Sequence, residues 1–89
     1  MSKKLEEVIG HAIEKAGTVA LVEVRDTEII VTVPGTDYGV TYYKPANSPQ
    51  LLVKNFPRDD KHASITRSEF LALALRLAND RARELGWIL

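Results

Sequence analysis

The 89-residue sequence contains no cysteine, which excludes disulfides, thiolate zinc sites, iron–sulfur clusters and cysteine nucleophiles. It also has no excess charge, because twelve Lys and Arg residues balance twelve Asp and Glu residues. This balance lacks the bulk attraction that favours nucleic acids or anionic membranes. No apolar run approaches the roughly 20 residues needed to cross a membrane, and the charged N-terminal segment lacks the apolar core of a signal peptide. We therefore expect a cytoplasmic protein that does not bind membranes.

The composition, with 45% apolar and 27% charged residues, is that of an ordinary globular domain. A chain of this length has room for one domain, which we place at residues 1–89, and buries about two-thirds of its unfolded surface. We find no internal repeat and no low-complexity tract. The sequence therefore predicts one modest core that needs no disulfide or metal to hold it together.

Apolar residues at helical spacing predict two amphipathic helices. The first is expected to begin after Ser2 and to end at Gly17; its apolar face would consist of Leu5, Val8, Ile9, Ala12, Ile13 and Ala16. The second has a capping box, in which Thr66 is the N-cap and Glu69 is the third helical residue. Gly86 is expected to end it just after Leu85.

Between the helices the hydrophobic period changes from 3.6 to 2, which predicts strands over residues 18–25, 28–33 and 38–44 and a short fourth strand over 50–54. Short loops at Asp26-Thr27 and at residues 34–37 would pair Val22 with Val31 and Val31 with Val40. If the meander continues, Leu51 would lie opposite Tyr42. The expected fold is α+β, a two-layer sandwich of an antiparallel three- to four-stranded meander with both helices on one face. The expected core residues are Ile9, Val22, Val31, Val40, Ala74 and Ala78.

The densest polar stretch precedes the second predicted helix. It contains Arg58, Asp59, Asp60, Lys61, His62 and, at the helix start, Arg67. One interpretation is a nucleic-acid site that uses the basic residues of 58–67. Another is an enzyme in which His62 acts as a base or, with a carboxylate, binds a metal. A third interpretation is a solvated loop that has no functional role. We favour it because the sequence supplies no third metal ligand, no glycine-rich phosphate loop and no nucleophile motif. We therefore expect no catalytic residues, no metal and no cofactor.

The outer face of the predicted sheet is unusually apolar for a solvent-exposed face. The predicted register directs five large apolar residues outward, namely Val19, Leu21, Ile30, Tyr43 and Leu52. In a meander that begins at residue 18, the strand Thr18–Val24 would also be an edge with only Glu23 as a charged residue, and such an edge can pair with another chain. The sequence therefore favours a protein-interaction module or homodimeric subunit that uses the first-strand edge and the outer sheet face.

Overall fold

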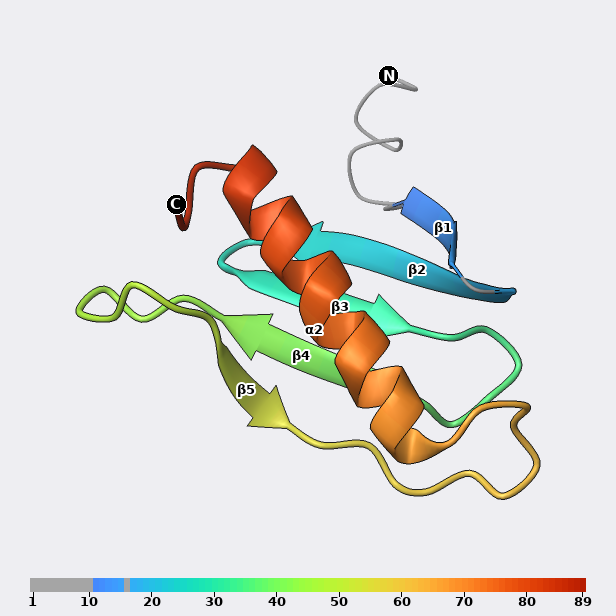
Figure 1. Cartoon of the computed structure of the whole chain (residues 1–89). Coiled ribbons are helices and arrows are strands. Elements are labelled where there is room, and N and C mark those ends of the chain that lie inside the picture. Colours follow the sequence, from blue (N-terminus) through green and yellow to red (C-terminus); the bar gives the residue numbers. More distant parts are fainter. Residues whose placement is uncertain (1–10, 16) are drawn as a thin grey trace.

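The computed structural model describes residues 11–15 and 17–89. Its elements are β1 (His11–Lys15), β2 (Thr18–Arg25), β3 (Glu28–Thr32), β4 (Gly39–Tyr43), β5 (Leu52–Asn55) and α2 (Arg67–Glu84). The strands form one antiparallel five-stranded sheet in the order β1-β2-β3-β4-β5, and α2 lies against one face of it (Figure 1). The α+β class and the antiparallel meander are thus confirmed, whereas the described residues form five strands and one helix in place of the predicted three to four strands and two helices.

The predicted register of the three central strands is confirmed. Val22 pairs with Val31, and Val31 pairs with Val40. Asp26, which has a φ of 54°, and Thr27 form the turn between β2 and β3 and place Arg25 opposite Glu28. Because side chains alternate between the two faces of a sheet, this register places all three valines on the same face, where each is at most 2% exposed.

The prediction of a helix between Ser2 and Gly17 is wrong for the part of it that the structure describes. Residues His11–Lys15 form β1, which pairs with β2 so that Ile13 lies opposite Ala20. Ala12 and Ile13, expected on one helix face, therefore point to opposite faces of the sheet. Gly17, expected to end a helix, instead has a φ of +83° in the turn between β1 and β2. Residues 1–10 of that predicted helix, including the expected core residue Ile9, lie outside the described residues.

The expected first-strand edge is also wrong, because β2 is paired on both sides. β1 covers the backbone of Thr18–Val22 on one side, and β3 covers Leu21–Arg25 on the other. Pairing satisfies backbone N–H and C=O groups that an edge strand would leave open. The sheet edges in the described chain are β1 and β5.

The pairing of β5 is shifted by two residues from the predicted register. Tyr42 lies opposite Val53 rather than Leu51, and the register shifts again between Tyr42 and Thr41. Thr41 pairs with Asn55, which leaves Lys54 as the extra residue of a bulge. The long loop before β5 contains two prolines and imposes no fixed register, unlike the tight turns between the central strands.

Helix α2 begins and ends with the predicted signals. The Thr66 hydroxyl accepts a hydrogen bond from the Glu69 N–H, and the Glu69 carboxylate accepts one from the Thr66 N–H. At the other end the Trp87 N–H donates to the Ala82 carbonyl oxygen and the Gly86 N–H to that of Arg83, a Schellman motif with Gly86 at a φ of +79°. A capping box of this kind contributes about 1 kcal/mol to stability.

The core lies between α2 and the inner face of the sheet. The helix contributes Phe70, Ala74, Leu77, Ala78 and Ala82, all buried, as predicted for Ala74 and Ala78. The ring of Phe70 stacks on that of Tyr38, with centroids 5.0 Å apart and planes 8° apart. Two helices were expected on this face, but α2 is the only helix among the described residues.

Candidate functional site

The five apolar residues that were predicted to face outward form one continuous diagonal across the helix-free face, which we call the outer-face stripe. Tyr43 pairs directly with Leu52. Ile30 is diagonal to Tyr43, because it lies opposite Thr41. Leu21 is diagonal to Ile30 in the same way, since it lies opposite Thr32. Val19 completes the stripe two residues before Leu21 on β2. Diagonal neighbours are about 7–8 Å apart, within reach of long side chains.

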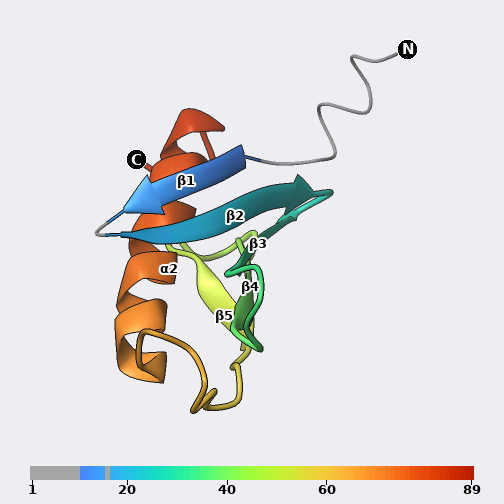
Figure 2. The same cartoon turned by 90° about the vertical axis from the view of Figure 1, so that its right-hand side faces the viewer.

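No described element covers the outer-face stripe. Figure 2 shows α2 on one side of the twisted sheet only. Val19 is 47% exposed and Leu52 is 43% exposed, and the other three residues are partly exposed. Within the described residues, no helix is long and apolar enough to cross a membrane. Among the described residues, the stripe is therefore an apolar surface that no other element covers.

Two ion pairs border the stripe along one side. The guanidinium of Arg25 lies 2.6 Å from the carboxylate of Glu23. The ammonium of Lys54 lies 2.5 Å from the carboxylate of Glu28. The hydrogen bond from Arg25 to Glu23 raises the pKa of Arg25. Lys54, Glu28 and Tyr43 also line a shallow depression of about 400 Å³ at this end of the stripe. Since each acid has a basic partner, the border adds polarity to the face but no net charge.

The polar stretch at residues 58–62 links the loop before α2 to the turn between β3 and β4, and we call this link the clasp. The Asp60 carboxylate accepts a hydrogen bond of 2.8 Å from the Asp37 N–H, in the turn between β3 and β4, and one of 2.9 Å from the His62 N–H. These hydrogen bonds, led by the one from Asp37, hold the pKa of Asp60 below its usual range. The loop before α2 is thus fastened to a turn 23 residues earlier in the chain.

Tyr38 is the second half of this clasp. Its ring is 2% exposed, and its hydroxyl donates a hydrogen bond of 3.2 Å to the Ile65 carbonyl oxygen just before the helix cap. Burial raises the pKa of the Tyr38 hydroxyl, and the negative charge of Asp59 acts in the same direction. The sequence placed Tyr38 in a strand and Asp60 in a loop, but the contact between the two segments could be found only in the folded chain.

The clasp predicts a specific acid sensitivity. Because the folded-state pKa of Asp60 is depressed, its stabilising contribution is present above the ordinary aspartate value of 3.8 and is lost as the pH falls through the folded-state pKa. Asp60→Asn should therefore lower the urea midpoint at neutral pH but change it little in acid. Asp59→Asn is the matched control: Asp59 accepts a hydrogen bond of 3.4 Å from the Tyr38 hydroxyl, which an asparagine side-chain oxygen can also accept, but no backbone N–H bond among the described residues. Equal losses for Asp60→Asn at both pH values would contradict this role.

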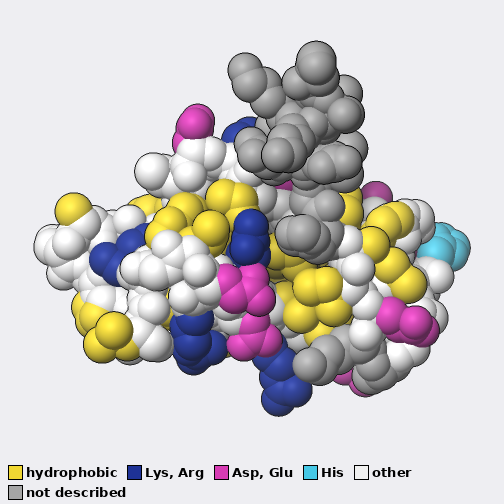
Figure 3. Space-filling view, turned by 90° about the horizontal axis from the view of Figure 1, so that it is seen from above, with side chains coloured by type: hydrophobic (Ala, Val, Ile, Leu, Met, Phe, Trp, Pro, Cys, Tyr) yellow, Lys and Arg dark blue, Asp and Glu magenta, His cyan; other side chains and the backbone are white. Residues whose placement is uncertain are grey.

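The remaining members of the polar stretch form no ion pair among the described residues. Arg58, Lys61, His62 and Arg67 are all exposed. The described residues contain no group of three or more His, Asp or Glu side chains placed to hold a metal ion. Figure 3 shows that, on the face seen from above, basic and acidic side chains lie side by side. The 58–67 region likewise contains Asp59 and Asp60 among its basic residues, and Glu69 follows it in α2. The nucleic-acid interpretation of this region stays a prediction.

Sequence reasoning missed a groove beside α2. It runs between the helix and the segment 49–51 that precedes β5, and the C-terminal segment 88–89 forms part of its wall. Its volume is about 610 Å³, within the range of ligand sites. Leu75 lines this groove; its spacing placed it on the apolar face of the predicted helix, but in the structure it lies at the border of that face and is 46% exposed.

Comparison of the chain with protein-family models, with curated proteins and with solved structures found no match.

Proposed function

We propose that this chain is a homodimeric protein-interaction module in which two copies pack sheet against sheet through the outer-face stripe. The observation that supports the proposal is the stripe itself, a continuous apolar diagonal that α2 does not cover. Antiparallel sheets with one solvated face normally carry polar residues there. A second copy would remove Val19 and Leu52 from water without any change in the fold.

The charge arrangement is compatible with a second copy of the same chain. Glu23 and Glu28 each have a basic partner within the chain, and the net charge of the whole sequence is zero. Glu14 of β1, which lies opposite Val19 on this face, has no ion pair among the described residues, so each face brings only this one unpaired acid to the contact. A two-fold axis would bring the same residues together from both copies, and sheets stacked in this way pack about 10 Å apart.

The sheet edges are less suited to pairing than the face. β5 has four residues and carries a bulge at Lys54, and Pro57, which has no N–H, follows shortly after its end. β1 has five residues, including the exposed Glu14. Short strands, charges and bulges are the features that discourage edge pairing. The interface that we propose is thus the face, in place of the first-strand edge expected from the sequence.

The size of the face sets the expected strength of the dimer. Five strands spaced about 4.8 Å apart and about five residues long give a flat face of roughly 400 Å². This area does not include the extra surface of the protruding side chains. With the surface of the protruding side chains added, the total area that the two copies would bury approaches about 1,200 Å², the lower limit for a specific interface. Interfaces at this lower limit are typical of weak or transient association, so we expect a reversible dimer.

Sedimentation equilibrium of the whole chain, measured over a series of micromolar concentrations, tests the proposal. The apparent mass should rise with concentration from 9.9 kDa toward twice that value. A mass that stays at one chain throughout the range would refute the homodimer.

A further inference from the structure

The groove beside α2 extends along most of the exposed flank of the helix. The part between α2 and the segment 49–51 has a volume of about 610 Å³. A second depression of about 360 Å³ continues it toward Ala72. Both are lined by Leu75, Asn79 and Arg83, which lie four residues apart on one side of the helix. The two depressions therefore form one surface, which we call the α2 groove.

The α2 groove combines apolar walls with hydrogen-bonding side chains. Leu51 and Ile88 form its apolar walls together with Leu75, which is 46% exposed although it lies beside the core. The amides of Asn79 and Gln50 lie at its margin. Neither amide takes part in a side-chain hydrogen bond among the described residues. Side-chain amides of this kind pair with both N–H and C=O groups of an extended backbone.

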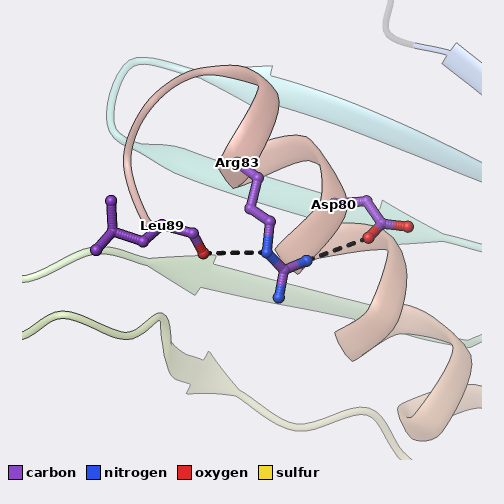
Figure 4. Close-up of polar contacts among 3 residues, drawn as sticks. All are labelled: Asp80, Arg83 and Leu89. Atoms are coloured by element: carbon purple, nitrogen blue, oxygen red, sulfur yellow. Dashed lines mark hydrogen bonds and ion pairs between the residues drawn. The ribbon is translucent and has the colours of Figure 1, made fainter.

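Arg83 shows how the α2 groove contacts a segment of chain. Its Nε donates a hydrogen bond of 3.1 Å to the carbonyl oxygen of Leu89, and its Nη1 donates one of 3.3 Å to the Asp80 carboxylate (Figure 4). The third guanidinium nitrogen, Nη2, takes part in neither contact. Arg76, on the same flank, has no ion pair among the described residues. Because Asp80 is paired with Arg83, Arg76 is the charged side chain of this lining that has no ion pair among the described residues.

We propose that the α2 groove binds an extended segment of another protein that carries an acidic residue next to aliphatic side chains. The aliphatic side chains would pack against Leu75 and Ile88, and the carboxylate would pair with Arg83 or Arg76. The flank from Ala72 to Arg83 is about 17 Å long at 1.5 Å per residue, which corresponds to about five residues of extended chain. The α2 groove is open along its length, which suits a peptide better than a small ligand that needs enclosure.

This proposal is independent of the homodimer, because the α2 groove and the outer-face stripe lie on opposite sides of the sheet. The test selects a phage-displayed library of random peptides on the immobilised full chain and then measures the enriched peptides by fluorescence polarisation. The enriched sequences should share an acidic residue beside Leu, Ile or Val. Arg83→Gln and Leu75→Glu should each weaken binding about tenfold, the effect expected from losing one charge-assisted hydrogen bond or one apolar contact. Arg67→Gln, an exposed cation at the far end of α2, is the matched control and should leave the affinity unchanged.

Two results would overturn the proposal. One is a selection that enriches no sequence above the starting library. The other is a set of enriched peptides that bind wild type, Arg83→Gln and Leu75→Glu equally, because such peptides occupy another surface. Circular dichroism melting of both variants shows that the fold is retained. If the wild-type chain is monomeric but still binds acidic peptides in the α2 groove, the homodimer proposal is refuted and the groove proposal stands.

Discussion

Replacing Phe70 with alanine should lower the free energy of unfolding by about 3–5 kcal/mol, the largest stability loss that we expect from a single substitution. The side chain is fully buried, at 0% exposure, and its ring stacks on Tyr38 at 5.0 Å. Its loss leaves a cavity where the first turn of α2 meets the sheet and the clasp. Because a chain of 89 residues has a total stability of about 4–13 kcal/mol, this loss is a large fraction of the total.

Urea unfolding followed by circular dichroism measures this effect. Leu75→Ala is the matched control on the same helix; because Leu75 is 46% exposed, the expected loss is below about 1 kcal/mol. Phe70→Leu should fall between the two, since it keeps part of the buried volume. Equal midpoints for Phe70→Ala and Leu75→Ala would mean that α2 does not pack on the sheet through Phe70.

Replacing Leu21 with lysine should convert the dimer to a monomer. Leu21 lies between Ile30 and Val19 in the outer-face stripe, opposite Thr32 and Ala12, and its side chain points away from the core. In a two-fold interface the substitution places a positive charge from each copy near an apolar surface. Like charges and their desolvation should raise the dissociation constant at least about a hundredfold. Sedimentation equilibrium at a concentration where wild type is dimeric shows the change directly.

Asn47→Lys is the control for Leu21→Lys, because it adds the same charge at an exposed turn between β4 and β5. This variant should remain dimeric. Thermal melting of both variants should show folded chains, since neither substitution alters a core residue. A Leu21→Lys chain that dimerises as strongly as wild type would place the interface somewhere other than the outer-face stripe.

The central sheet and α2 could be predicted because their signals are local. A two-residue turn fixes the register of β2 and β3, and the alternation of apolar residues then selects the buried face. The capping box around Thr66 and Glu69 likewise depends on residues three positions apart. These signals do not require knowledge of distant parts of the chain.

Residues 11–15 were misassigned because their pattern satisfies two structures. Ala12 and Ile13 fit the apolar face of a helix, yet Ile13 alone also fits the inward side of a strand. A glycine with positive φ at Gly17 is equally suited to ending a helix and to closing a hairpin. Backbone pairing with β2 decides between a helix and a strand for these residues. The spacing of apolar residues does not predict this tertiary interaction.

The candidate sites show the same division between local and distant information. The outer-face stripe followed from strand alternation, and its predicted residues do share one face. The clasp between Asp60 and Asp37 joins segments 23 residues apart, and the α2 groove requires the position of segment 49–51 beside Leu75. Neither contact has a sequence pattern of its own, so a polar loop and an exposed leucine were the only signals available.

Methyl NMR with a soluble paramagnetic agent tests most directly whether the outer-face stripe is an interface. Spectra of the whole chain are compared below and above the dissociation constant of the dimer. The methyl signals of Leu21, Ile30 and Leu52 should be attenuated in the dilute sample and shielded in the concentrated one, whereas those of Leu75 should be attenuated equally in both. Unchanged attenuation of Leu21, Ile30 and Leu52 with concentration, or shielding of Leu75 in their place, would contradict the account.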